Sequence, residues 1–433
     1  MPRPQELAIE TNAGADLLEM DFPSLRIGTA DYPAGPTGAT VFWFPERAVG
    51  AVDVRGGAPG TYNLDWLRQG HEFPNLDAIA ISGGSWYGLG VAAGVSAALK
   101  EKGHRSGHWA NLATVVGAIV YDFGTRRLTS CHPDERLGAA ALAAALPGRF
   151  PQGAYGAGRN TMQGSYFGLW LHSGQGGAFQ QIGPTKIAAF AVVNAVGVVV
   201  NREGAIHRGN QRIPGGERHV RELLAQVPET IRTQDGSIFG LRRKEVISPA
   251  NTTISIVATN QKITYAQLQR LATQVHMSMS RAIQPFATAN DGDVLFAVST
   301  AEVDHPELHP TDLGVVASEV MWSAILNSVP AVTMPTDPGP PLSIEAIGGM
   351  YALAPGVNME VHVRDPELVL TVRGSRDVFD IQPGASVRAA GRAVNTFAVD
   401  HPFLESIRFV KSPQGAVDLL LNPGHWQQQG TRL

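Results

Sequence analysis

The chain has 433 residues, of which 44% are hydrophobic and 17% are charged, so it can bury a large core and is not a disordered chain. Domains usually span roughly 100–200 residues, which predicts two domains, or one large domain and one small one. The 34 Lys and Arg residues nearly balance the 38 Asp and Glu residues, and the net charge of −4 gives no electrostatic reason to expect a nucleic-acid partner.

Cysteine content and hydropathy restrict the compartment and the kinds of metal site. Cys131 is the only cysteine, so the chain cannot form an internal disulfide or a cysteine-based zinc site. The N-terminus has no basic start followed by an apolar stretch, and no apolar run reaches about 20 residues. We therefore expect a cytoplasmic protein with no membrane partner.

In chain order, a loose arm over residues 1–20 is followed by alternating β-like and helical segments over 21–329. Apolar runs predict strands at 76–81, 251–259 and 294–299, and two buried strands within 185–201 that are separated by a turn at 194–197. Helices are predicted at 90–102, from the N-cap Thr264 to Pro285, and at 312–326. This alternation predicts an α/β domain.

The pattern changes after a proline-rich stretch. Five prolines predict a stiff linker over residues 330–344: Pro330, Pro335, Pro338, Pro340 and Pro341. Beyond it, apolar and polar residues alternate at 359–364, and Ser412-Pro413-Gln414-Gly415 between two apolar runs is typical of a hairpin. Residues 345–433 are therefore predicted to be a small all-β module.

Asn251-Thr252-Thr253 begins one of the predicted buried strands. Both threonines suit a strand start because of their β propensity. The second interpretation is a self-cleavage junction, in which the Thr252 hydroxyl attacks the Asn251 carbonyl and water then hydrolyses the ester. Thr252 would then begin a new chain, and its α-amine, with an ordinary pKa of about 8, would help to deprotonate its own hydroxyl. The local sequence leaves both interpretations open.

Other segments offer candidate partners for that threonine, each with a plain structural alternative. Asp291-Gly292-Asp293 is either a turn before a strand or a pair of carboxylates that share proton transfer. Asn194 either makes a turn or donates its amide to a developing oxyanion, a contribution of about 3 kcal/mol. Tyr121 lies in an apolar run and is by default a core aromatic residue.

Motifs of one known family are spread over residues 20–327. They include MDFPSLRIGTADYPAGPTGATV (20–41), ISGGSWYGLGVAAGVSAAL (81–99), NAVGVVVNREG (194–204), NTTISIVATN (251–260) and QVHMSMSRAIQPFATANDGDVLFAVST (274–300). With these motifs the chain resembles the self-processing N-terminal-nucleophile amidases, which comprise the L-aminopeptidase D-amidase/esterases and the β-aminopeptidases, and within them the branch of nylon-oligomer hydrolases.

The resemblance implies a four-layer αββα sandwich and cleavage between Asn251 and Thr252 into α and β chains that remain associated, as a homotetramer of αβ units. The site residues that it implies are a nucleophile, its acidic pair, an oxyanion-side asparagine and a site-lining tyrosine: Thr252, Asp291, Asp293, Asn194 and Tyr121. It implies small amide or peptide substrates, such as 6-aminohexanoate oligomers, and neither a metal nor an organic cofactor.

Three departures from the family pattern leave the function open. Ser165 follows Gly164 where relatives typically have a Gly-Lys pair, so this possible site-lining residue supplies no ammonium charge. The segment 205–249 before the junction is longer than in the nylon-oligomer branch, and the C-terminal β module has no assigned chemistry. The leading hypothesis is amide hydrolysis through an acyl-enzyme on Thr252. The alternatives are acyl transfer to an amine and a catalytically inactive binding or scaffold protein.

Overall fold

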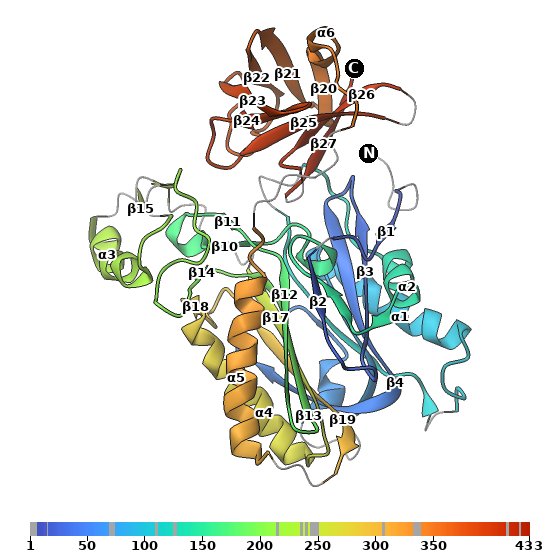
Figure 1. Cartoon of the computed structure of the whole chain (residues 1–433). Helices are drawn as coiled ribbons and strands as arrows, with labels where there is room; N and C mark the ends of the chain where they lie inside the picture. The colour runs from blue at the N-terminus through green and yellow to red at the C-terminus, as the bar shows by residue number, and fades with distance from the viewer. Residues whose placement is uncertain are drawn as a thin grey trace.

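The computed structural model describes residues 7–14, 16–68, 74–108, 111–123, 128–213, 216–233, 237–238, 241–242, 251–304, 308–331, 339–412, 415–423 and 426–433. A mixed α/β part carries most of the chain, and a β-barrel formed by the C-terminal residues lies at one end of it (Figure 1). At this level the predicted fold class, mixed α/β with an all-β C-terminal part, is confirmed.

Over the described ranges, the main sheet has eleven strands, in the order β12-β13-β17-β19-β4-β6-β7-β5; off this path, β3 pairs with β4, and β1 and β8 pair with β3. Strands β17 and β19, and strands β6 and β7, are parallel pairs, whereas the other neighbours are antiparallel. Their bounds are β1 (Glu10–Thr11), β3 (Arg26–Tyr32), β4 (Thr37–Val54), β5 (Thr61–Tyr62), β6 (Asn75–Ser82), β7 (Val115–Ile119), β8 (Leu146–Pro147), β12 (Gln175–Ile182), β13 (Thr185–Asn194), β17 (Thr252–Gln261) and β19 (Val294–Val303).

Short strand pairs connect the segments around the sheet. They are β2 (Leu17–Glu19) with β9 (Arg149–Pro151), β10 (Met162–Gln163) with β11 (Leu171–His172), β14 (Val198–Val199) with β18 (Ile283–Gln284), and β15 (Ser237–Ile238) with β16 (Leu241–Arg242). Strands β1 and β2 lie in the arm that was expected to be loose. Backbone pairing with β3 and β9 therefore attaches part of that arm to the α/β part.

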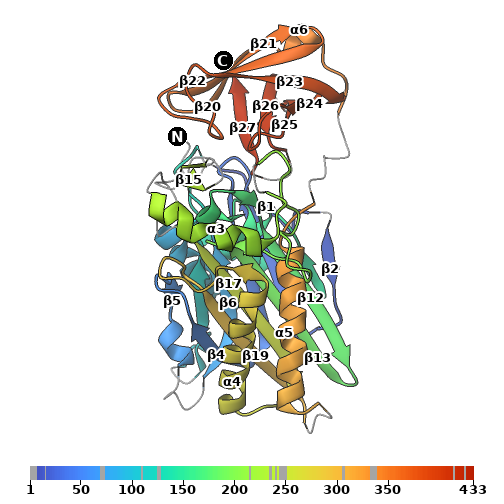
Figure 2. The same cartoon turned by 90° about the vertical axis from the view of Figure 1, so that its left-hand side faces the viewer.

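Two helix pairs cover opposite sides of the strands (Figures 1 and 2). Helices α1 (Gly90–Glu101) and α2 (Glu135–Ala143) pack on the half that contains β3, β6 and β7, and α4 (Tyr265–Ser278) and α5 (Pro310–Asn327) pack on the half that contains β12, β13 and β19. One apolar cluster contains residues from both halves of the sheet, including Phe42, Ile79, Phe190, Ile254 and Phe296. Burial of this apolar surface is the main stabilising contribution to the fold.

Most predicted elements agree with the structure. Strands β6, β17 and β19 and helices α1 and α5 confirm the predicted strands and helices, and β13 and β14 confirm two strands within 185–201, although β14 has only two residues. The predicted helix that ends at Pro285 is wrong at its C-terminus. It is capped by Thr264 as expected, but α4 ends at Ser278 and a 3-10 turn, Met279–Arg281, follows. The chain leaves the helix early because Ile283 and Gln284 pair with β14.

The C-terminal strands close into a barrel of eight, as far as the described residues extend. They are β20 (Gly349–Ala354), β21 (Val357–Arg364), β22 (Glu367–Gly374), β23 (Ser386–Ala393), β24 (Thr396–Val399), β25 (Ser406–Lys411), β26 (Val417–Leu421) and β27 (Gln428–Arg432), preceded by the short α6 (Ile344–Ile347). The predicted hairpin joins β25 to β26. Of the predicted linker, 332–338, with Pro335 and Pro338, lies outside the described residues.

The barrel shares buried side chains with the α/β part. One apolar cluster contains barrel residues such as Tyr351 and Phe409 together with Leu169 and Val198. The indole Nε1 of Trp426 also donates to the carbonyl oxygen of Thr161 at 2.6 Å. Helix α3 (Val220–Thr233) begins beside this cluster, to which Val220 and Leu223 belong. Among the helices that the structure describes, none is both long and apolar enough to cross a bilayer.

Candidate active site

The predicted junction lies at the start of β17, where three distant segments meet. Asn194, the last residue of β13, pairs with Thr252 in the antiparallel register, and Asn251 forms a parallel bridge with Asp291. Asn251 and Thr252 are both buried. Strand register therefore places the junction, the acidic pair and Asn194 in one site.

The carbonyl oxygen of the peptide bond between Asn251 and Thr252 accepts two hydrogen bonds. The Thr252 hydroxyl donates to the Asn251 carbonyl oxygen at 2.5 Å, and the Gly292 backbone N–H donates to the same oxygen at 2.9 Å. A Cβ atom at position 292 would lie 2.6 Å from Thr252 Oγ1, so only glycine fits here without displacing the hydroxyl. Both donors polarise the carbonyl that the hydroxyl would attack.

Asp291 and Asp293 are buried and accept hydrogen bonds from backbone N–H groups. Asp293 Oδ1 accepts from Thr253 at 2.6 Å, and its Oδ2 accepts from Ala287 at 3.1 Å. Asp291 Oδ2 accepts from the N–H of Thr288 at 3.0 Å and from its hydroxyl at 2.8 Å. Burial raises the pKa of Asp291, and burial together with the Asp291 charge raises the pKa of Asp293 well above its usual range. Such a pair retains a proton at higher pH than two exposed carboxylates and can exchange it.

A glycine-rich loop over residues 55–58 forms backbone hydrogen bonds with the turn 291–293, which carries both aspartates. The N–H groups of Arg55 and Gly56 donate to the Asp293 carbonyl oxygen, and the N–H of Ala58 donates to that of Asp291 at 2.8 Å. A Cβ atom at Gly56 would lie 2.2 Å from the Asp293 nitrogen. The paired glycines of this loop, Gly56 and Gly57, are the sequence signal that could have indicated this close backbone approach.

Asn194 links the site to two further segments. Its Oδ1 accepts from the Met162 N–H at 3.1 Å, and its Nδ2 donates to the Tyr121 carbonyl oxygen at 2.8 Å. Tyr121 therefore belongs to the same group of segments through its backbone, and its ring lies edge-on to Phe123 at 5.6 Å. In the intact chain, the Asn251 carbonyl oxygen accepts from Thr252 and Gly292, whereas the Asn194 amide hydrogen bonds to Tyr121.

Ser165 contacts the junction directly. It is buried, and its hydroxyl donates to the Asn251 side-chain oxygen Oδ1 at 3.1 Å. The position at which this chain departs from the family pattern therefore contacts Asn251, the residue before Thr252. Sequence reasoning missed the contributions of Gly292, Thr288 and the loop 55–58. Of these, Thr288 is detectable, since a threonine three residues before an aspartate is a common turn pattern.

A metal site would require several ligating side chains close together. Within the described part of the chain, no three His, Cys, Asp or Glu side chains are grouped as a metal site would require.

The sequence also matches a known protein family. The family model of Peptidase family S58 matches residues 20–337, and this range ends before the barrel strands.

Proteins and structures of known function resemble the same region. The 6-aminohexanoate-oligomer endohydrolase of Paenarthrobacter ureafaciens is 42% identical over 335 residues, which cover 75% of this chain and 89% of that protein. The protein of the same name from Agromyces sp. is 41% identical over 334 residues, with the same coverage. A Burkholderia sp. β-aminopeptidase structure has a TM-score of 0.51 at 19% identity and covers 76% of this chain and 91% of its own, which shows similarity of fold.

Proposed function

Because this chain belongs to Peptidase family S58, and is therefore a hydrolase of amide or peptide bonds, we propose that it cleaves itself between Asn251 and Thr252 and then uses Thr252 as an N-terminal nucleophile. Its substrates are short amide oligomers of the 6-aminohexanoate type or small peptides. The similarity to the two 6-aminohexanoate-oligomer endohydrolases supports this substrate class.

Self-cleavage begins at the carbonyl that carries both donors. Thr252 Oγ1 attacks the Asn251 carbonyl carbon, the Gly292 N–H stabilises the resulting oxyanion, and the C–N bond breaks as the nitrogen takes up the proton that the hydroxyl loses. Water then hydrolyses the ester, which leaves a carboxylate on Asn251 and a free amine on Thr252. The contact of 2.5 Å between the hydroxyl and the carbonyl oxygen is the observation that carries this step.

Substrate hydrolysis repeats this chemistry on an external amide. The free amine of Thr252 takes the proton of its own hydroxyl, and Oγ1 attacks the substrate carbonyl carbon. The amide C–N bond breaks as the departing amine takes up that proton, which leaves an acyl-enzyme. Water then attacks the ester, releases the acid and restores the hydroxyl. Asn194, opposite Thr252 in the sheet, supplies an amide to the oxyanion once the junction has opened. Asp291 and Asp293, whose pKa values burial raises, hold and return the proton. Tyr121 lines the site, and no step requires a metal or an organic cofactor.

The proposal includes the arrangement of the whole chain. The apolar cluster between the two halves of the sheet and the helix pairs on their outer sides support a four-layer αββα sandwich. We assign residues 1–20 to an arm, 21–329 to the hydrolase domain, 330–344 to a linker and 345–433 to the β module. The processed αβ units form a homotetramer in the cytoplasm, and light scattering after size-exclusion chromatography tests its mass.

Intact mass spectrometry of the purified protein tests the central step. Self-cleavage gives two fragments whose masses sum to 46.0 kDa plus one water, with Thr252 at the new N-terminus. Thr252→Ala remains one chain without activity on 6-aminohexanoate oligomers, whereas Thr252→Ser keeps a hydroxyl and is processed. An active protein that stays intact, or an active Thr252→Ala variant, would exclude the mechanism. Product analysis with added amines distinguishes hydrolysis from acyl transfer.

A further inference from the structure

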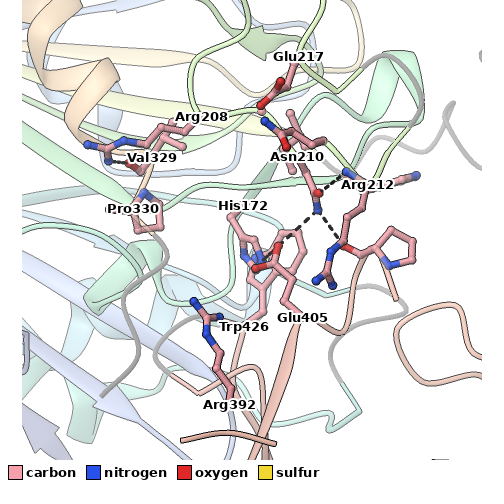
Figure 3. A pocket seen from close by; sticks show the side chains of 16 residues that line it. His172, Arg208, Asn210, Arg212, Glu217, Val329, Pro330, Arg392, Glu405 and Trp426 are labelled. Atoms are coloured by element: carbon pink, nitrogen blue, oxygen red, sulfur yellow. Dashed lines mark hydrogen bonds and ion pairs between the residues drawn. The ribbon is translucent and has the colours of Figure 1, made fainter. Parts of the chain in front are cut away.

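A cavity lies where the barrel meets the α/β part, and we call it the junction pocket (Figure 3). Its volume is about 490 Å³, within the range of small-molecule sites. Its walls come from 170–172, 208–212, 217 and 329–331 on one side and from Arg392, Pro402, Glu405 and Trp426 on the other. Residues of the candidate active site do not line it, so the inference below is independent of the proposed function.

The floor of the junction pocket is aromatic and carries one carboxylate. Trp426 is almost fully buried, and its ring centroid lies 3.5 Å from that of His172. Glu405 Oε1 lies 3.8 Å from His172 Nε2 and accepts from Asn210 Nδ2 at 3.4 Å. Burial raises the pKa of Glu405, although Arg212 and Arg392 oppose this shift. An ammonium group placed beside this carboxylate would recover part of the solvation lost on burial.

The rim of the junction pocket is cationic. Arg208, Arg212 and Arg392 face the cavity, with Glu217 the one acidic rim residue among the described lining residues. Arg208 donates to the Val329 carbonyl oxygen, and Arg212 donates to that of Val399 at 2.7 Å. Arg392, by contrast, has no hydrogen bond or ion pair within the described part of the chain. Arg392 is exposed at the rim, and its guanidinium can bind a carboxylate through two parallel hydrogen bonds.

The backbone of the junction pocket shows that it is a constrained site. Trp170, Arg208 and Trp426 have φ values of 47°, 49° and 44°, in the left-handed region. This conformation is unusual for bulky side chains, and such residues cluster at active sites and ligand-binding sites. Three such residues line one cavity, and they come from both parts of the chain.

We propose that the junction pocket binds a small zwitterion, a free amino acid or ω-amino acid, with its ammonium group at Glu405 and its carboxylate at Arg392. A simple anion would meet the carboxylate of the floor, and a simple cation would meet the arginine rim. Only a ligand with both charges satisfies the floor and the rim together. The aromatic floor packs against the aliphatic part of the ligand.

The test is calorimetric titration of the full chain with 6-aminohexanoate, hexanoate and hexylamine. Because 6-aminohexanoate contains no amide bond, its binding is separate from turnover. We expect saturable binding of 6-aminohexanoate and at least ten-fold weaker binding of the other two probes. Glu405→Gln and Arg392→Ala each weaken 6-aminohexanoate binding at least ten-fold. Arg388→Ala is the matched control, since Arg388 is exposed on the same strand, β23, outside the pocket; it leaves the affinity unchanged.

Two results would overturn the proposal. One is equal affinity for all three probes, or no binding at millimolar concentration. The other is binding that survives both pocket variants but is lost in Thr252→Ala, because the ligand would then occupy the active site. Arg392 makes no hydrogen bond or ion pair in the described part of the chain, so Arg392→Ala should unfold at nearly the same urea concentration as the parent chain, and this keeps the test valid if Glu405→Gln is unstable. Failure of self-cleavage would leave these titrations unaffected.

Discussion

At the scale of single residues, the candidate site depends on the space left by the missing side chain of Gly292. Gly292 lies between the two aspartates, and its missing side chain allows Thr252 Oγ1 to approach while its N–H reaches the Asn251 carbonyl oxygen. The sequence motif drew attention to the carboxylates on either side. The structure adds the backbone N–H between them, which donates to the Asn251 carbonyl oxygen and would be the oxyanion donor in the proposed self-cleavage.

Gly292→Ala tests this donor. The added methyl group would lie 2.6 Å from Thr252 Oγ1 and 2.9 Å from the Ala58 carbonyl oxygen, so either the hydroxyl or the backbone must move. Alanine keeps the N–H, so the substitution acts by displacing the hydroxyl or the donor from the Asn251 carbonyl group. We expect self-cleavage to slow by about 100-fold, an effect as large as the loss of one oxyanion contact. A time course of the two fragments on denaturing gels measures the rate. Gly391→Ala, where nothing lies within 4 Å of the new methyl group, should process normally. A normal rate for Gly292→Ala would contradict the assignment.

Asp31 predicts a pH dependence of stability that is unrelated to catalysis. Its carboxyl is fully buried, and burial raises its pKa to about 6 even though Arg159 opposes the shift. In the unfolded chain the pKa is about 4, so the folded state holds the proton more tightly. The contribution of Asp31 to stability is therefore full below about pH 4 and is lost, by up to about 3 kcal/mol, as the pH rises through about 6.

Asp31→Asn removes this titration but keeps an oxygen to accept from the Gly156 N–H. Urea unfolding of both proteins between pH 4 and pH 7 measures the effect. The difference in unfolding free energy between the parent chain and the variant should fall over that range. A difference that is constant with pH would show that Asp31 does not titrate there.

At the scale of elements, β4 allows the two halves of the sheet to be continuous. Residues 37–43 pair with β3, and residues 49–54 pair with β19. The register with β6 shifts between Trp43 and Ala48, and Arg47 has a φ of 69° in this irregular stretch. A bulge bends a strand and increases its twist, which lets one strand change partners. Hydrophobic periodicity alone did not predict β4, because its two ends pair with different strands and the register shifts between them.

Helix α4 provides a test at the same scale. Thr264 and Gln267 form a capping box, in which the Thr264 hydroxyl accepts from the Gln267 N–H at 3.2 Å. Thr264→Ala should lower the unfolding free energy by about 1 kcal/mol, the usual cost of losing an N-cap. Urea titration at neutral pH measures the change, and Arg270→Ala, exposed on the same helix, should have little effect. Equal stability of both variants would show that the cap is unimportant here.

At the scale of the whole molecule, the barrel and the α/β part are joined by a common core. Trp426 on the barrel contacts His172, and its indole N–H hydrogen bonds to Thr161. The sequence predicted a module that follows a linker, and it contained no signal for this shared cluster. The shared side chains favour unfolding of the two parts as one cooperative unit.

Trp426→Ala tests the shared core. Removing a buried tryptophan typically costs about 3–5 kcal/mol, because apolar contacts are lost and a cavity remains. We expect a fall of that size in the unfolding free energy, measured by urea denaturation with circular dichroism. Trp86→Ala is the matched control, since Trp86 is 74% exposed and its loss should change stability by less than about 0.5 kcal/mol. A small effect of Trp426→Ala, or two separate transitions in the parent chain, would indicate independent folding.

The sequence by itself determined the local elements and the family. Apolar periodicity, the Thr264 cap and the turn glycines act over a few residues, so they could be recognised without the fold. The family motifs also identified Asn251, Thr252 and the acidic pair. Only the tertiary structure decided which groups surround them: Gly292 and Ser165 on Asn251, the loop 55–58 on the aspartates, and the junction pocket. These contacts join residues far apart in the chain, and strand register and packing, which no short window of sequence contains, determine their positions.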